Sequence, residues 1–180
     1  MKYLIGSKLL GLSNAKDTDY MVISNEYDYK RIYENGEDVM HISEDHMLKC
    51  MNFNYDFKEC AHFLILNYQY DADIIGQNFP IDYHLLDHRS KVIKLLKNII
   101  TNKLLNMNKR VSVKGEFCSK YMYHIAYNVF ILQNNSPIIT PEQKEIIQKL
   151  HDRTMPISFR DELINMIINL KEDTNNETSV

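Results

Sequence analysis

The chain opens with two short apolar runs joined by a polar segment. The first run ends in Gly6-Ser7, and the second run, Tyr20 to Ile23, directly follows Asp17-Thr18-Asp19. Residues i and i+2 of a β-strand point to the same face. If the second run is a strand that Asp17 opens, the carboxylates of Asp17 and Asp19 project side by side. The start of the chain therefore predicts strands with two acids at one end.

Two neighbouring carboxylates repel each other, and a shared divalent cation keeps both of them ionised. We expect Gly6-Ser7 to lead from the first strand into a short helix over residues 7–13. The N-terminus of that helix and the Ser7 hydroxyl would bind phosphate oxygens, and Gly6 would leave them room. A phosphate site beside paired carboxylates is typical of metal-assisted phosphoryl or nucleotidyl transfer. The alternative is a hairpin that turns over residues 14–17, with both acids in solvent.

The same residues carry a resemblance to a known family. Gly6-Ser7, nine intervening residues and Asp17-x-Asp19 resemble the GS…DxD motif of the DNA polymerase beta-type nucleotidyltransferase superfamily. Gly6-Ser7-x-x-x-Gly11-Leu12 before Asp17-Thr18-Asp19-Tyr20 is most similar to the predicted nucleotidyltransferases associated with RNA-ligase and RNA-repair operons. The resemblance spans residues 1–170, and its specific part is the first twenty or so. Lys8 stands where that family often has arginine.

Three later motifs follow in the order that the family shows. These motifs are Asp38-Val-Met-His-Ile, Asn54-x4-Glu59 and Lys120-x3-His124. The resemblance implies that Asp38 is the third metal-facing acid, and a solvated strand end is the alternative. We expect Glu59 to support the site without binding the metal. Lys120 and His124 lie one helical turn apart and would meet the triphosphate, although the same helix could simply pack its tyrosines into a bundle.

The resemblance implies a metal-dependent nucleotidyltransferase that transfers a nucleoside monophosphate from an NTP to an acceptor hydroxyl. The acceptor is expected on RNA, or else on a protein side chain. The expected metal is Mg²⁺ or Mn²⁺, held by Asp17, Asp19 and Asp38, with Gly6-Ser7 and Lys8 binding the substrate. The alternative is an inactive member of the fold that binds nucleotide or a partner protein.

Composition limits the remaining classes of protein. The formal net charge of −3 argues against a broad nucleic-acid surface, although a local basic patch can still bind RNA. Three cysteines without a C-x-x-C spacing favour reduced thiols over a zinc site or a disulfide. No segment approaches the roughly 20 apolar residues of a membrane span, and the start has no signal-peptide layout. We therefore expect a cytoplasmic protein without membrane contact; its oligomeric state is left open.

The predicted fold class is α+β, with a small mixed β-sheet at the N-terminus followed by a helical bundle. Residues 25–36 are expected to form a polar connection with a turn at Asn35-Gly36. Thr140-Pro141-Glu142-Gln143 predicts a capping box that opens a helix. The expected strands are 2–6, 19–24 and 38–43, and the expected helices are one that starts at Ser43, then 56–67, 83–107, 119–133, 141–151 and 158–170. The expected domains are a nucleotidyltransferase core at 1–67, a helical region packed on it at 68–172 and a frayed tail at 173–180.

Overall fold

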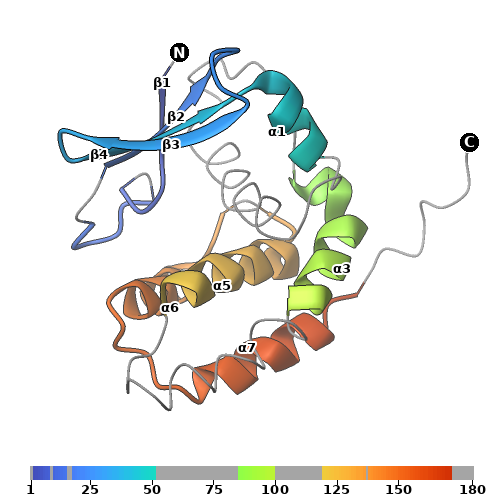
Figure 1. Ribbon diagram of the computed structural model, residues 1–180. Coiled ribbons are helices and arrows are strands. Elements are labelled where there is room, and N and C mark those ends of the chain that lie inside the picture. The colour runs from blue at the N-terminus through green and yellow to red at the C-terminus, as the bar shows by residue number, and fades with distance from the viewer. Residues whose placement is uncertain are drawn as a thin grey trace, which may run out of the picture. The chain divides into compact units, whose positions relative to one another are not determined.

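The chain divides into two compact units, Met1–His84 and Leu85–Val180. The computed structural model describes residues 2–8, 10–15, 18–51, 85–99, 119–136 and 138–171. The described residues of the first unit contain a four-stranded sheet followed by a helix, and those of the second unit contain helices (Figure 1). The predicted order of a sheet followed by helices is confirmed. The boundaries expected after residues 67 and 172 lie outside the described residues.

The sheet is mixed, as the sequence predicts. Its strands are β1 (Lys2–Ile5), β2 (Thr18–Ile23), β3 (Tyr29–Glu34) and β4 (Glu37–Ile42), in the order β1-β2-β4-β3. β2 pairs antiparallel with β1 and parallel with β4, and β4 pairs antiparallel with β3. The central position of β4 therefore places its residues directly beside those of β2.

β3 is a strand that the sequence analysis did not predict. It lies at the edge of the sheet, and most of its side chains are exposed, so it lacks the alternation of apolar residues that marks a half-buried strand. The turn predicted at Asn35-Gly36 is confirmed as the link between β3 and β4. Asn35 has φ 53° and Gly36 has φ 79°, and a two-residue hairpin turn of type I′ requires a positive φ at both positions.

One face of the sheet forms the core of the first unit. Side chains of alternate residues point to the same face. The buried side chains of β1, β2 and β4 follow this period, and α1 (Glu44–Met51) adds Met47 to them. The buried apolar residues of these elements are Tyr3, Ile5, Met21, Met40, Ile42 and Met47.

The helix expected over residues 7–13 is wrong. The described residues there form a series of turns, with N–H to C=O bonds from Leu10 to Gly6, Gly11 to Lys8 and Leu12 to Ser7. The sequence span of these bonds changes from one bond to the next, whereas an α-helix repeats the same bond to the fourth residue back. Gly11 has φ 63°, in the left-handed region, which a right-handed helix does not use.

The second unit is built around the helix α5 (Ser119–Asn134). Almost every side chain from Met122 to Leu132 is buried, which is typical of a helix surrounded by other elements. α5 packs against α6 (Pro141–His151) and α7 (Phe159–Ile168). The 3₁₀ helix η2 (Leu85–His88) leads into α3 (Arg89–Ile99), which packs on α7. These helices confirm the predicted helical second half. The helix expected at 56–67 lies outside the described residues, and of the helix expected at 83–107 only residues 85–99 are described.

The capping box predicted at the start of α6 is confirmed. The Thr140 hydroxyl accepts a hydrogen bond from the Gln143 N–H at 3.3 Å, and the Gln143 side chain accepts one from the Thr140 N–H at 2.9 Å. Gln143 also exchanges two hydrogen bonds with Asn134, at 2.8 and 3.1 Å. The end of α5 is therefore tied to the start of α6 by side-chain amides.

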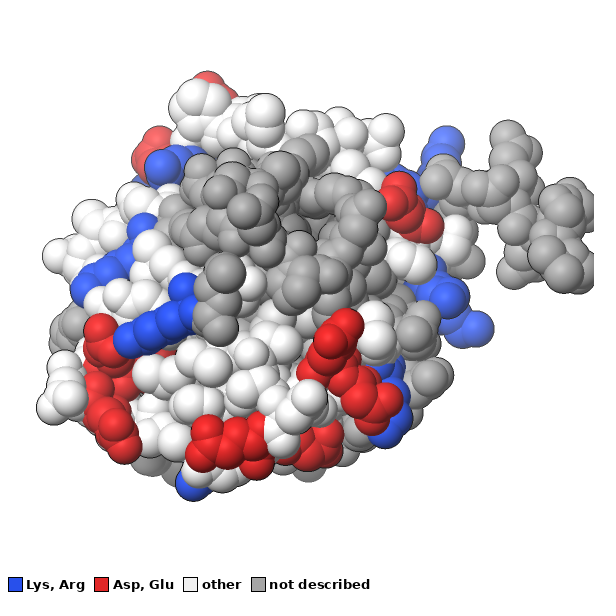
Figure 2. Space-filling view, turned by 90° about the horizontal axis from the view of Figure 1, so that it is seen from above, with Lys and Arg blue, Asp and Glu red and all other residues white. Residues whose placement is uncertain are grey.

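Figure 2 shows the charged residues that lie on one face. In the view of Figure 2, Lys and Arg stand in several separate positions, with acidic residues between them. This distribution agrees with the slightly acidic net charge of −3. Among the helices of the described part, none has both the length and the apolar composition that a membrane crossing requires.

Candidate functional site

The parallel pairing of β2 with β4 sets two acids side by side. Asp19 lies opposite Asp38 in the ladder. Each strand has a buried methionine two residues after its acid, Met21 in β2 and Met40 in β4. The two acids therefore lie on the core face of the sheet, where β2 and β4 begin. Each carboxylate retains 22% of its exposure. Neighbouring strands lie about 4.8 Å apart, so two unscreened carboxylates here repel each other.

Asp17, the other acid of the predicted pair, lies outside the described residues. In the described part of the chain, no three His, Cys, Asp or Glu side chains are grouped as a metal site requires. The predicted metal role of Asp17 therefore stays a prediction, and the arrangement that can be described consists of Asp19, Asp38 and their neighbours.

Gly6 packs against the carboxylate of Asp19. Ile5 pairs with Asp19 across β1 and β2, and Gly6 follows directly with φ 80°. A Cβ atom added at Gly6 would lie 2.3 Å from Asp19 Oδ2 and 3.0 Å from both Asp19 Cβ and Cγ. The sequence argument for glycine was the room that phosphates need. The structure gives a nearer cause, because the Asp19 carboxylate already fills the space of a side chain.

Ser7 and Lys8 continue from Gly6 at the same end of the sheet. Ser7 is buried, with 9% of its surface exposed, and its carbonyl accepts the Leu12 N–H at 3.0 Å. The ammonium of the exposed Lys8 donates a hydrogen bond to the hydroxyl of Thr18, the first residue of β2. The structure therefore brings the predicted substrate-binding residues Gly6, Ser7 and Lys8 to the end of β2 at which Asp19 lies.

Arg31 joins the two acids, and sequence reasoning missed it. Its Nε lies 2.7 Å from Asp38 Oδ1 and 2.9 Å from Asp38 Oδ2, and it donates to both oxygens. One of its terminal nitrogens lies 3.6 Å from Asp19 Oδ1. The hydrogen bond to Asp38 raises the pKa of the Arg31 guanidinium above its ordinary value. The guanidinium therefore carries its charge and offsets part of the repulsion between the carboxylates.

A signal for Arg31 was present in the hairpin. In an antiparallel pair joined by a two-residue turn, the register follows from the turn. Arg31 pairs with Met40, which puts it on the same face as Asp38 and diagonally adjacent to it. Recognising residues 29–34 as a strand would have placed Arg31 beside the acid.

The charged groups at this end of the sheet are the two carboxylates, the Arg31 guanidinium and the Lys8 ammonium beside Thr18. Carboxylate oxygens are the ligands that Mg²⁺ and Mn²⁺ prefer. Asp19 and Asp38 thus match a divalent cation in donor type, and the ladder places them on adjacent strands. Arg31 occupies the Asp38 oxygens that such a cation would use.

Lys120 and His124, predicted to meet the triphosphate, belong to α5 of the second unit. The ring centroid of His124 lies 3.7 Å from that of Tyr123, and its carbonyl accepts the Asn128 side-chain amide at 2.7 Å. The side chain of Lys120 lies outside the described part, as does Glu59. The substrate roles of Lys120 and His124 stay predictions.

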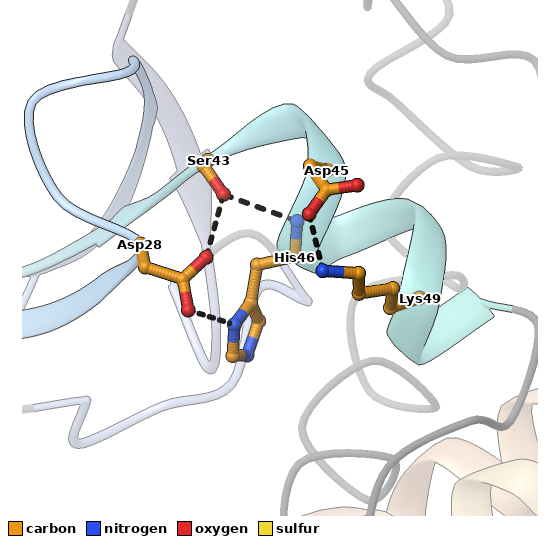
Figure 3. Close-up of polar contacts among 5 residues, drawn as sticks. All are labelled: Asp28, Ser43, Asp45, His46 and Lys49. Atoms are coloured by element: carbon orange, nitrogen blue, oxygen red, sulfur yellow. Dashed lines mark hydrogen bonds and ion pairs between the residues drawn. The ribbon is translucent and has the colours of Figure 1, made fainter.

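A second aspartate-centred cluster lies at the opposite end of β3 (Figure 3). The Ser43 hydroxyl donates to Asp28 Oδ1 at 2.9 Å and accepts the His46 N–H at 3.0 Å. His46 Nδ1 lies 3.0 Å from Asp28 Oδ2 and donates to it, because a carboxylate can only accept. His46 is 4% exposed. The hydrogen bonds from His46 and then from Ser43 lower the pKa of Asp28.

This cluster contains Ser, His and Asp but differs from a nucleophilic triad. In a triad the serine hydroxyl bonds to the imidazole, which takes up its proton. Here the Ser43 hydroxyl bonds to Asp28 and accepts from the backbone of α1, as a helix N-cap does. The contacts indicate a structural role in joining β4 to α1.

No protein-family model, no curated protein and no solved structure matches the chain. The geometry of its residues therefore carries the functional argument.

Proposed function

We propose that the protein is a metal-dependent nucleotidyltransferase that transfers a nucleoside monophosphate from an NTP to an acceptor hydroxyl, with RNA as the preferred acceptor. The observation that carries this proposal is the register of the sheet. It sets Asp19 beside Asp38 on adjacent strands and packs the turn at Gly6 against Asp19. Two like charges on adjacent strands repel each other, and a divalent cation bound by both would remove that repulsion.

In this proposal the chain's own groups bind and orient the substrate. Asp19 and Asp38, with Asp17 as a third donor, hold Mg²⁺ or Mn²⁺, which supplies positive charge to the phosphates and activates the acceptor hydroxyl. The Gly6-Ser7 turn presents backbone N–H groups and a hydroxyl at the same end of the sheet. Lys8 adds a positive charge beside the first residue of β2. Together these groups position a triphosphate next to the acids.

A second candidate function is supported by Arg31. Its contacts with Asp38 and Asp19 offset part of the negative charge with a cation that belongs to the chain. A protein that had lost turnover could keep its fold with such an ion pair in place of a metal. The second candidate is therefore an inactive nucleotidyltransferase-fold module that binds nucleotide or a partner protein.

The test is incubation of the full chain with each α-³²P-labelled NTP, Mg²⁺ or Mn²⁺, and total cellular RNA and protein. We expect metal-dependent label on RNA, and loss of that label in the double variant Asp19→Asn, Asp38→Asn. The matched control is Glu34→Gln, which removes an exposed acid of β3 that takes no part in the cluster. Metal-dependent nucleotide binding in calorimetry without any labelled product would favour the binding module. Absence of both label and binding would overturn both candidates.

A further inference from the structure

Arg31 binds the carboxylate of Asp38 through both of its oxygens. Both oxygens of this carboxylate accept hydrogen bonds from one nitrogen, at 2.7 and 2.9 Å. A divalent cation that binds Asp38 needs lone pairs of the same oxygens. It would also stand close to a guanidinium of the same sign, and like charges at this range repel each other. The Arg31 contact and a metal on Asp38 therefore compete for the same carboxylate.

Arg31 is able to leave Asp38 without disturbing the core. Its side chain is 43% exposed, and it extends from an edge strand whose other side chains are mostly exposed. Solvent screens a partly exposed pair of this kind, and the arginine loses side-chain freedom when it pairs, so the contact is weaker than a buried one. In the proposed function, a cation of twice the charge that two carboxylates bind together would compete with the single guanidinium for Asp38.

A nucleotide brings a new partner for the released side chain. The guanidinium binds phosphate as well as carboxylate, because its N–H groups match the spacing of the oxygens in both. In the proposed function the triphosphate binds at the same carboxylates from which Arg31 withdraws. The distance that Arg31 must cover is therefore short, from the acid to a phosphate held beside that acid.

We propose that Arg31 is a nucleotide-phosphate ligand held in reserve on Asp38: it pairs with the acid in the metal-free protein and transfers to the triphosphate when the metal takes its place. This inference rests on the proposed function. It makes metal and triphosphate binding cooperative, since each ligand favours the state in which Arg31 has left the acid. Such coupling is reciprocal by thermodynamic necessity.

The experiment compares the full-length wild-type protein with Arg31→Met, using two probes that contain no base. The first probe is Mn²⁺ alone, with free Mn²⁺ measured by electron paramagnetic resonance. We expect Arg31→Met to bind Mn²⁺ about fivefold more tightly, because the competing cation is gone. The second probe is inorganic tripolyphosphate, added in calorimetry at saturating Mn²⁺. We expect the same variant to bind it roughly tenfold more weakly, because a charged phosphate contact is lost.

The control is Lys30→Met, which removes the same charge from the neighbouring residue. The Nζ atom of Lys30 lies 4.4 Å from the centre of the Tyr27 ring. Lys30 is on the opposite face of β3 from Arg31, because neighbouring residues of a strand point to opposite faces. If the opposite shifts arose from net charge alone, Lys30→Met would reproduce them, and the proposal would be overturned. Arg31→Gln serves as a second variant, and circular dichroism confirms that each protein is folded.

The remaining outcomes separate this inference from the function on which it rests. If the wild-type protein binds both probes and Arg31→Met binds both unchanged or both more weakly, Arg31 is not exchanged, and the inference fails while the proposed function stands. Tighter binding of both probes would show competition without transfer to phosphate, which also overturns the inference. If the wild-type protein binds neither probe, the proposed function fails as well.

Discussion

The two ends of the sheet each hold an aspartate with hydrogen-bonded neighbours, and the two clusters differ in what they do for the fold. Asp28 binds the side chains of Ser43 and His46, which cap and orient α1. Asp38 binds Arg31 and lies beside Asp19, a second negative charge. The first cluster satisfies groups that the fold has buried. The second cluster concentrates charge where β2 and β4 begin, and it caps no helix.

This difference separates a structural cluster from a candidate binding site. A buried imidazole and the open N–H groups of a helix start need partners, and Asp28 with Ser43 supplies them. Asp38 likewise gives Arg31 a partner, but the pairing of Asp19 with Asp38 places two negative charges on adjacent strands beside this one guanidinium. The cost in repulsion points to a role outside folding, which the following variants test.

The largest expected effect is the loss of activity in Asp38→Asn. Removing a ligand of the proposed metal removes several kcal/mol of transition-state stabilisation, so nucleotidyl transfer should fall by a factor of about 100 or more. The matched variant at the other end, Asp28→Asn, should retain transfer. Initial rates with labelled NTP, measured on both proteins at temperatures below their unfolding transitions, decide the comparison. Equal loss in both variants would remove the distinction between the two ends.

The next effect is on stability, in Gly6→Ala. The added Cβ would lie 2.3 Å from Asp19 Oδ2, at a residue with φ 80°. A strained backbone and a steric clash together should lower the free energy of unfolding by about 2–3 kcal/mol. In an Asp19→Ala background, where Oδ2 and Cγ are absent, we expect the cost of Gly6→Ala to fall to about 1 kcal/mol. Urea unfolding of the four proteins measures this coupling, and strict additivity would show that the carboxylate is not the cause.

A smaller effect is expected for Ser43→Ala at the structural end. The variant loses the hydroxyl that accepts the His46 N–H and donates to Asp28, so the free energy of unfolding should fall by about 1 kcal/mol. Mn²⁺ affinity should be unchanged, because Ser43 does not contact the Asp19–Asp38 pair. A change in Mn²⁺ affinity of more than twofold would show that the two ends are coupled through the sheet.

The smallest effect is a dependence on pH that Asp28 confers. Its hydrogen bonds lower the folded-state pKa below the ordinary value of 3.8. The charged carboxylate therefore stabilises the fold above that value, and this contribution is lost as pH falls through the lowered folded-state pKa. Asp28→Asn should be less stable than the wild type at neutral pH, and the difference should shrink below about pH 4. Thermal melts across this range test the sign, and a difference that widens on acidification would refute it.

Much of the fold follows from sequence patterns, because those elements have a buried side or a recognisable cap. β1, β2 and β4 each contain buried apolar residues, and α6 opens with Thr140 and Gln143 as a capping box. β3 was missed because it is an edge strand with mostly polar side chains, and only its turn, Asn35-Gly36, is visible in the sequence. The helix predicted over residues 7–13 was wrong for the opposite reason. The leucines there suggest a helix, but Gly11 has φ 63°, which a right-handed helix does not use.

The candidate site was predictable to a similar degree. Asp19 could be proposed because it stands at the start of an apolar run that predicts a strand. Asp38 was proposed from the family resemblance, at the start of another predicted strand, and the ladder sets the two acids opposite each other. Arg31 could not be found by the same reasoning, because its position depends on pairing between strands rather than on a local pattern. The reason that position 6 requires glycine is also a contact across the sheet, because a Cβ atom there would clash with Asp19. Pairwise contacts between distant residues are the information that one unaligned sequence lacks.

The hairpin of β3 and β4 has a consequence for the order in which the unit folds. A hairpin with a two-residue turn closes in about 1–10 μs, whereas pairing of strands distant in sequence is slower because a longer loop must close first. Arg31 and Asp38 lie on the two arms of this hairpin, and Asp19 joins only when β2 docks on β4. We therefore expect the acid of β4 to meet its arginine before it meets the second acid. In that order of folding, Asp19 would approach an acid whose charge Arg31 already offsets in part.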